Sequence, residues 1–211
     1  MVNMRRILTT MIFGVAALVI MTGCGRVRYP KYYTLDLPAP PDPPAGENAH
    51  ATLAVREFRA PPYLRQRSIV YKTSAEQIGF YAYHRWAIDP REFVTNSVIE
   101  RLRGSGVFAH VKPYDGSRDI DYVLSGRLEK LEEIDYQGSI KVQVALLAEV
   151  TSIATRATVW TNSVSEIGDV NQHDVPAVVA EMDRTMQRAI EKLLSPMPSD
   201  LATGGTAAKG N

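Results

Sequence analysis

The chain has 211 residues, and its 24 lysines and arginines nearly balance its 23 aspartates and glutamates. This balance gives no electrostatic reason to expect nucleic-acid binding. The single cysteine excludes an internal disulfide, so burial of apolar side chains must hold the fold together.

Residues 1–23 have the organisation of a bacterial export signal, with arginines ahead of an uncharged, mostly apolar run over residues 7–21. The run is short for a membrane helix, which needs ~20 apolar residues. Thr22 and Gly23 place small side chains before Cys24, and this pattern resembles the lipobox of bacterial lipoproteins. The resemblance implies cleavage before Cys24 and a lipid on its thiol. The alternatives are an uncleaved membrane anchor and an ordinary cysteine beside a signal cleavage site.

A proline-rich segment follows, from Pro38 to His50 (PAPPDPPAGENAH), and it is too rich in proline to join a sheet or a helix. It is predicted to be an extended polyproline II spacer. Residues 31–37 (KYYTLDL) alternate as a strand does. The predicted organisation is a signal peptide over 1–23, a lipidated N-terminus and linker over 24–50, a folded domain over 51–196 and a disordered tail over 197–211.

The first half of the domain is predicted to form short strands. Residues 52–58 (TLAVREF) have a strand pattern, which the prolines of residues 60–63 end. Residues 68–73 and 78–83 predict the two strands of a hairpin, with a turn at residues 74–77.

A helix is predicted from Asp89 to Gly106. Asp89 is a typical N-cap residue, because Pro90 follows at the first helical position and Glu92 stands at the third. One apolar face recurs at four-residue spacing: Val94, Val98 and Leu102. A strand is predicted next, over residues 107–114. Strand, helix and returning strand together predict one parallel pair joined by a right-handed crossover.

The second half predicts a meander of three longer strands over residues 121–134, 138–152 and 157–167. Alternate residues of the middle strand from Ile140 to Val150 are apolar and should share one face. Irregular spacing in the first strand predicts a bulge near Lys130.

Residues 175–193 carry an apolar stripe at helical spacing, and Asp174 can cap that helix. The predicted fold class is therefore α+β: a mostly antiparallel, mixed β-sheet with two amphipathic helices packed on one face.

No catalytic constellation is recognisable in the sequence. The four histidines have no ligand spacing between them, and the chain lacks phosphate-loop, dinucleotide and nucleophile-elbow motifs. We therefore expect no enzyme activity, no metal site and no cofactor. An acidic cluster is predicted to be solvated at a hairpin end: Glu129, Glu132, Glu133 and Asp135.

Several motifs in order resemble the ABC-type transport auxiliary lipoproteins, the family that includes paraquat-inducible protein C. They are the lipobox at Cys24, YYTLDL over 32–37, PPYLRQRSIV over 61–70, HRWAIDP over 84–90 and the closing amphipathic helix. The motif over 61–70 departs from the family pattern at one place: Arg-Gln-Arg replaces the family's usual Asp-Arg-Pro at residues 65–67.

The resemblance implies a non-enzymatic subunit of a transporter that moves lipids or hydrophobic compounds between the inner and outer membranes. Its implied partners are an Mce-domain protein, a permease and an ATPase, with the membrane contacted through the lipid anchor. Gly25 follows the cysteine where an aspartate would signal inner-membrane retention, which favours the outer membrane, facing the periplasm. A homo-oligomer is compatible with the sequence. The alternatives are a structural or assembly lipoprotein of the outer membrane and a lipid carrier with its own apolar cavity.

The same motifs and the aromatic hairpin suggest a surface for partner binding, made by five residues: Tyr63, Leu64, Tyr83, Arg85 and Trp86. Trp86 is expected to pack one ring edge inward and to present the other, because buried tryptophan and arginine anchors dominate many interfaces. The competing interpretation is that these aromatic side chains belong to the core and its rim.

Overall fold

The structure, a computed structural model, describes residues 28–36, 49–136, 138–198 and 201. The signal segment, Cys24 and residues 37–48 of the proline-rich segment lie outside the described residues, as does most of the predicted tail. Two residues from the tail range, Met197 and Leu201, pack against the core.

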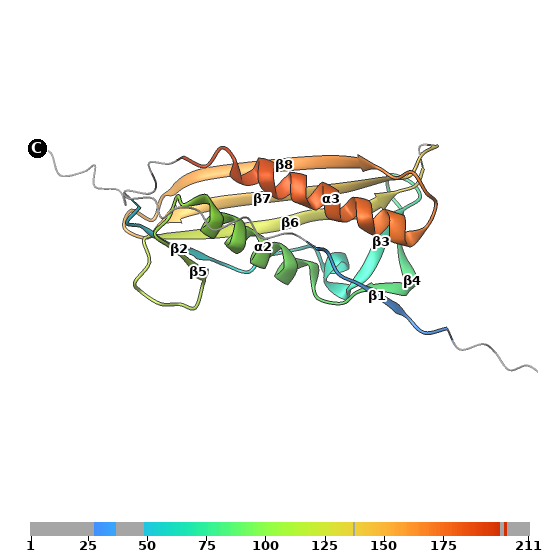
Figure 1. Cartoon of the computed structure of the whole chain (residues 1–211), viewed down its shortest axis with the longest axis horizontal. Helices are drawn as coiled ribbons and strands as arrows, with labels where there is room; N and C mark the ends of the chain where they lie inside the picture. Colours follow the sequence, from blue (N-terminus) through green and yellow to red (C-terminus); the bar gives the residue numbers. More distant parts are fainter. Residues whose placement is uncertain (1–27, 37–48, 137, 199–200, 202–211) are drawn as a thin grey trace, which may run out of the picture.

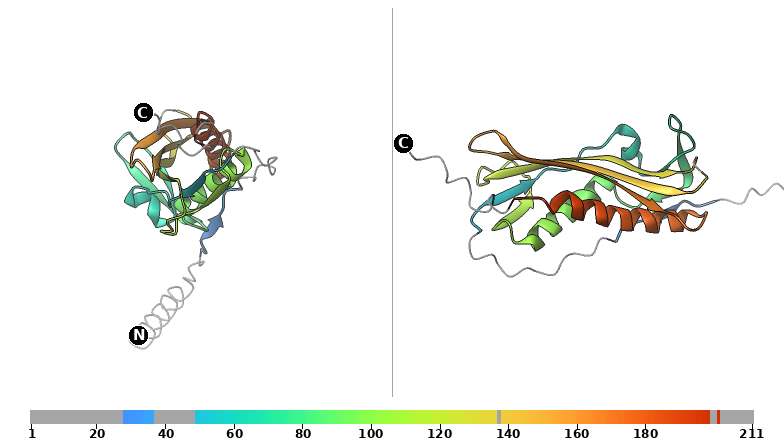
Figure 2. Two further views of the ribbon diagram at one scale, coloured as in Figure 1. Left: turned by 90° about the vertical axis from the view of Figure 1, so that its left-hand side faces the viewer. Right: turned by 90° about the horizontal axis from the view of Figure 1, so that it is seen from above.

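The described chain forms one eight-stranded sheet with two α-helices on one face (Figures 1 and 2). This confirms the predicted α+β class. The elements, in chain order, are β1 (Lys31–Tyr33), β2 (Thr52–Val55), η1 (Pro62–Gln66), β3 (Ser68–Lys72), β4 (Ile78–Trp86), α2 (Pro90–Ser105), β5 (His110–Pro113), β6 (Tyr122–Ile134), β7 (Lys141–Ser152), β8 (Thr158–Asp169) and α3 (Val175–Leu194).

The sheet is mixed because β6 has parallel partners on one side and an antiparallel partner on the other. On one side the strand order runs β1-β4-β3-β6-β2-β5, and on the other side β6 pairs with β7, which pairs with β8. The predicted hairpin is β3–β4, and the predicted meander is β6–β7–β8, all antiparallel. The returning strand β5 is parallel to its neighbour as predicted, but that neighbour is β2 and not β4, the strand directly before α2, so the predicted partner was wrong.

The register of the meander follows the predicted alternation. The apolar residues of β7 that share one face are all buried, and they pack under the helices: Val142, Val144, Leu146, Ala148 and Val150. The β6–β7 register shifts between Leu128 and Lys130, so the predicted bulge is confirmed. This shift keeps Leu128 and Leu131 both buried although they are three residues apart.

Both helices begin at the predicted caps. The Asp89 carboxylate accepts the Arg91 N–H at 2.9 Å, and the Asp174 carboxylate accepts the Ala177 N–H at 2.8 Å. Gly106 ends α2 in the left-handed conformation (φ 66°), which costs glycine little. Within the described ranges, no helix has the length and hydropathy of a membrane span.

The folded body includes residues ahead of the proline-rich segment. β1 pairs in parallel with β4, and Leu35 is buried. The Asp36 N–H donates to the Asp183 carboxylate of α3 at 2.8 Å. The chain on both sides of the proline-rich segment is therefore packed on the same body, which begins near Lys31.

We predict that Gly126→Ala lowers the free energy of unfolding by about 1–3 kcal/mol, because it overpacks a closed part of the core. A Cβ at Gly126 would lie 2.3 Å from two carbons of the Phe58 ring, which is fully buried. Urea unfolding of Gly126→Ala, Phe58→Leu and the double variant measures the coupling between the two sites. The double variant should lose less than the sum of the single variants, and strict additivity would contradict this packing.

Candidate functional site

The five residues predicted to bind a partner lie around the hairpin, but they differ in exposure. Leu64 and Trp86 are 2% and 4% exposed and belong to the core. Tyr63 is half-buried, and its hydroxyl donates to the Glu129 carbonyl at 3.2 Å. Tyr83 and Arg85 are exposed. A partner can therefore reach Tyr83, Arg85 and part of Tyr63, whereas Trp86 does not present a ring edge as expected.

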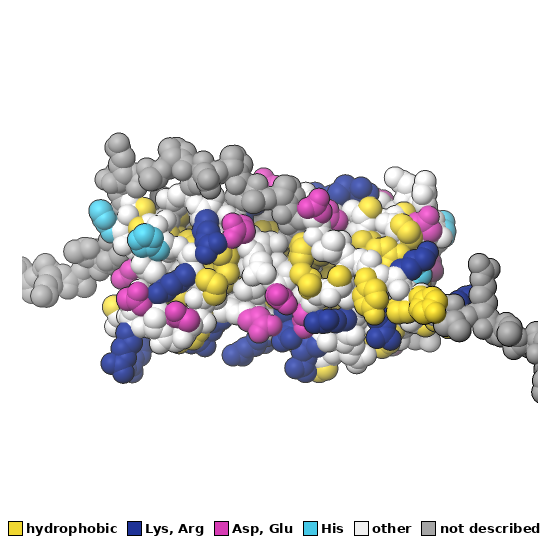
Figure 3. Space-filling view, turned by 60° about the horizontal axis from the view of Figure 1, so that its bottom comes forward, with side chains coloured by type: hydrophobic (Ala, Val, Ile, Leu, Met, Phe, Trp, Pro, Cys, Tyr) yellow, Lys and Arg dark blue, Asp and Glu magenta, His cyan; other side chains and the backbone are white. Residues whose placement is uncertain are grey.

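Large apolar side chains are exposed around β1 and β4, and we call this surface the aromatic end. Its members are Tyr29, Tyr32, Ile78, Phe80 and Tyr83. Tyr29 and Tyr32 are 80% and 63% exposed. The Arg28 guanidinium lies 6.0 Å from the centroid of the Tyr83 ring, within reach of a cation–π interaction. Figure 3 shows hydrophobic side chains gathered at this end of the molecule.

Behind the aromatic end, four rings in contact and one carboxylate form a polar cluster, which we call the tyrosine–histidine cluster. Its members are Tyr33, Tyr71, Tyr81, His84 and Glu133. The Tyr33 hydroxyl and His84 Nδ1 are 2.8 Å apart, and the Tyr81 hydroxyl donates to the Glu133 carboxylate at 2.9 Å. An irregular β3–β4 register between Ser68 and Val70 brings Tyr81 and His84 into contact. These bonds connect β1, β4 and β6 at one end of the sheet.

Burial controls the protonation of this cluster. Burial lowers the pKa of His84, and the nearby charge of Lys31 lowers it further, so the imidazole is neutral at pH 7. Burial and the Glu133 charge raise the pKa of Tyr81. Burial also raises the pKa of Glu133, and the hydrogen bond from Tyr81 offsets this only in part. The cluster supplies a hydrogen-bonded support for the strands that carry the aromatic end.

The prediction that the acidic cluster is solvated was wrong for two of its four residues. Glu132 and Glu133 are each 2% exposed, because the end of β6 lies beside β3, which pairs with it in parallel. Burial raises the pKa of Glu132 as well. Asp135 is exposed and Glu129 half-buried. No local pattern indicates the β3–β6 pairing, because it joins strands about 60 residues apart in the chain.

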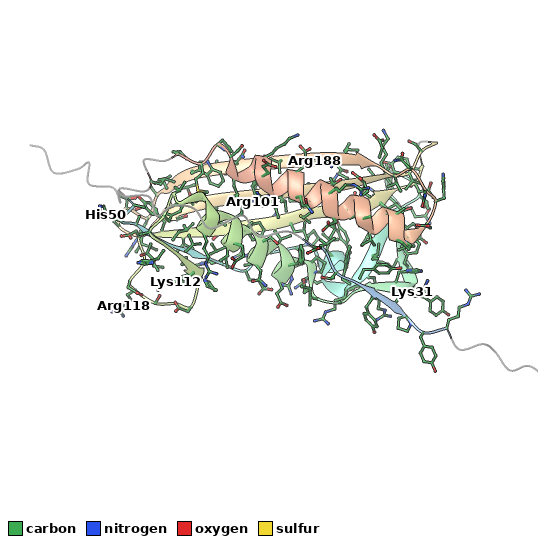
Figure 4. The ribbon with its side chains drawn as sticks, viewed as in Figure 1. Lys31, His50, Arg101, Lys112, Arg118 and Arg188 are labelled. Atoms are coloured by element: carbon green, nitrogen blue, oxygen red, sulfur yellow. The ribbon has the colours of Figure 1, made fainter. Side chains whose placement is uncertain are left out.

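The described residues contain no group of three or more histidine, cysteine, aspartate or glutamate side chains placed to hold a metal ion. Among them there are several open grooves. One of about 290 Å³ lies between α2 and α3 and is bordered by Phe93, Arg101 and Gln187. Figure 4 shows Arg101 and Arg188 on the helices, with Lys31 on β1 at the opposite end of the molecule from His50 and Arg118.

A sequence-family comparison matches residues 33–193 to the family described as the ABC-type transport auxiliary lipoprotein component. The chain belongs to this family. The matched range begins within β1 and ends within α3, so it covers nearly the whole folded body. The family is described as a transport auxiliary, not as an enzyme, and its members are lipoproteins associated with ABC-type transport. The search of curated proteins finds no match.

Solved structures with the same fold include protein XCC0632 from Xanthomonas campestris. It is 18% identical, with a TM-score of 0.67, over 78% of this chain and 92% of that one. A second crystal structure, of an uncharacterised protein, has a TM-score of 0.63 at 15% identity, over 81% and 99% of the two chains. The PelC dodecamer from Paraburkholderia phytofirmans is a weaker match, with a TM-score of 0.46 at 20% identity, over 73% and 92%. At 18% and 15% identity, the likeness to the first two structures establishes the fold alone.

We predict that Glu133→Gln raises the Tm at pH 7 by roughly 2–4 °C, the change that ~1 kcal/mol produces in a domain of this size. The folded-state pKa of Glu133 lies above its ordinary value of 4.5, so the buried carboxylate costs stability above the folded pKa. As the pH falls below 4.5 the group becomes protonated in both states, so the advantage of glutamine should shrink toward zero.

Thermal unfolding between pH 4 and pH 8 measures this difference. Glu76→Gln, in the exposed β3–β4 turn, is the control for removal of one negative charge. A Glu133→Gln variant that is less stable than the parent at pH 7 would show that the carboxylate bond to Tyr81 outweighs the cost of burial.

Proposed function

We propose that this chain is the non-enzymatic, lipid-anchored docking subunit of an ABC transporter that moves lipids or hydrophobic compounds between the inner and outer membranes. Cys24 carries the anchor in the outer membrane, and the folded body faces the periplasm. Its partners are an Mce-domain protein, a permease and an ATPase. The observation that carries the proposal is the aromatic end: a set of exposed rings on an edge of the sheet, in a chain of the transport auxiliary family.

The position of β1 supports docking close to the membrane. Lys31, where the folded body begins, follows Cys24 by only seven positions in the chain. A chain spans at most ~3.6 Å per residue, so this tether reaches no more than about 25 Å. β1 is also the edge strand next to the aromatic end. The proposed partner surface is therefore held near the anchoring membrane, where a transporter component that crosses the periplasm would meet it.

The exposed chemistry suits a protein partner. Tyrosine and arginine are enriched where proteins bind one another. Tyr83 has the Arg28 guanidinium near its ring, and Arg85 follows two residues later in the chain. The groove between α2 and α3 and a second groove on the sheet have volumes of about 290 and 380 Å³, at the low end for sites that enclose a small ligand. The exposed rings therefore favour docking of a protein partner, and the small grooves disfavour carriage of a whole lipid.

The proposed anchor predicts that Cys24→Ser abolishes acylation. Mass spectrometry of the mature wild-type protein should find an N-terminal Cys24 carrying lipid, and the variant should lack that mass. In fractionated cells the variant should leave the outer-membrane fraction. A wild-type N-terminus at another residue would contradict this anchor, whatever the docking surface does.

The docking surface predicts that Tyr83→Ala and Trp86→Ala separate binding from stability. Tyr83 is 45% exposed, so its truncation should change the Tm little but weaken binding of the Mce-domain partner by ~30-fold, the effect of losing ~2 kcal/mol. Trp86 is buried, and its truncation should cost about 3–5 kcal/mol of stability.

A photo-crosslinking residue at position 83 tests the contact in cells. It should capture a protein with an Mce domain, identified by mass spectrometry, whereas the same residue at Ser163 on the exposed face of β8 should not. Equal capture from both positions, or unchanged binding of Tyr83→Ala, would place the docking surface elsewhere on the body.

A further inference from the structure

Three arginines line one groove on the face of the sheet away from the helices: Arg56, Arg59 and Arg127. The groove has a volume of about 380 Å³. Its apolar lining comes from three aliphatic side chains, Val123, Leu147 and Ile153. All three arginines are exposed, and the groove belongs neither to the aromatic end nor to the tyrosine–histidine cluster.

The core fixes the outward direction of two of these arginines. The Phe58 ring lies against Gly126 on the inner face and is fully buried. The Phe58 N–H donates to the Thr95 hydroxyl of α2 at 2.9 Å. Successive side chains of extended backbone point to opposite faces, so Arg59 and Arg127 both face outward. Packing on the inner face of the sheet thus holds the positive charges of Arg59 and Arg127 side by side on the outer face.

Arg59 and Arg127 are direct register partners in a parallel bridge. The Arg59 N–H donates to the Gly126 carbonyl at 2.9 Å, and the Leu128 N–H donates to the Arg59 carbonyl at 2.8 Å. Like charges directly opposite each other on one face of a sheet are destabilising. An anion bound between them would remove this repulsion.

These charges have no internal counter-ion in the described part of the chain. None of the three arginines forms an ion pair within 4.0 Å there. The one acidic residue that lines the groove is Glu149, which also forms no such pair. The Arg56 guanidinium lies 4.4 Å from the centroid of the Tyr114 ring, which orients it without neutralising it.

We propose that this groove binds the phosphate headgroup of an anionic phospholipid. Guanidinium groups form two parallel hydrogen bonds to a phosphate, and their weak hydration favours this contact. The aliphatic lining would cover the glycerol and the first methylene groups of the acyl chains, whose burial contributes ~0.8 kcal/mol per methylene. A volume of about 380 Å³ suits a headgroup with the adjacent carbons, leaving the rest of the chains outside.

This site goes beyond the proposed docking role, because it lies on another surface and needs no transporter partner. Direct binding can therefore be measured on the full chain with Cys24→Ser, which removes the chain's own acyl groups as competitors. The probes are dihexanoyl phosphatidylglycerol and dihexanoyl phosphatidylcholine, both below their micelle concentration, and inorganic phosphate. Isothermal titration at physiological ionic strength gives each affinity.

Phosphatidylglycerol should bind at least ~10-fold more tightly than phosphatidylcholine and inorganic phosphate. Arg59→Gln and Arg127→Gln should each weaken its binding by roughly tenfold, as expected for the loss of a charge-assisted hydrogen bond. Glu149→Gln removes the one negative charge of the lining and should tighten binding. Arg118→Gln, in the exposed β5–β6 connection, is the matched control that removes one positive charge outside the groove.

Three results would overturn the site. Equal affinity for the two lipids would show that the net charge of the headgroup does not determine binding. Equal affinity for phosphatidylglycerol and inorganic phosphate would show that the groove binds phosphate without recognising a lipid. A loss in Arg118→Gln as large as that in Arg59→Gln would mean that the net charge of the body, not the groove, attracts the lipid. Capture of the Mce-domain partner by the arginine variants should be unchanged, so failure here leaves the docking proposal standing.

Discussion

The hydrogen bonding of β6 is the constraint on which the rest of the structure depends. This strand pairs with β7 along its whole length, with β2 near its beginning and with β3 near its end. Each of the other strands reaches the sheet through one of these three neighbours. β2 and β3 share one edge of β6, and the chain between them follows that edge, first through the Arg59–Arg127 bridge and then through η1, whose Leu64 is buried.

The two faces of β6 carry different functional groups, and which face a side chain points to changes at the bulge. Near β2 the inner face carries Gly126 under the Phe58 ring, and the outer face carries Arg127. Near β3 the bulge after Leu128 shifts the phase, so that Glu133 enters the tyrosine–histidine cluster. The buried Glu133 carboxylate and Arg127, which faces the like charge of Arg59, are both groups that cost stability, and both lie on β6. Unfavourable groups held by a rigid scaffold are typical of functional positions.

Much of the fold could be predicted from local patterns. The alternation of β7, the caps Asp89 and Asp174 and the bulge near Lys130 all depend on residues close in sequence, and the structure confirms them. The burial of Glu132 could not be predicted, because it follows from a parallel neighbour about 60 residues away. The arginine groove was missed for the same reason: Arg59 and Arg127 become neighbours only through a long-range bridge. The candidate partner residues were located on the right hairpin, but a motif alone could not separate the buried Trp86 from the exposed Tyr83.

The reach of the body from its proposed anchor depends on a short strand. β1 has three residues, so its ladder alone contributes few hydrogen bonds. Burial of Leu35, the contact between Tyr33 and His84 and the bond from Asp36 to α3 add to its stability. With these contacts made, the body begins at Lys31, seven positions after Cys24. Without them, the first packed residue would be Ala51, 27 positions after Cys24. At ~3.6 Å per residue the tether limit would grow from about 25 Å to about 97 Å. The tyrosine–histidine cluster therefore does more than support the aromatic end: under the proposed anchoring through Cys24, it also limits how far that surface can move from the membrane.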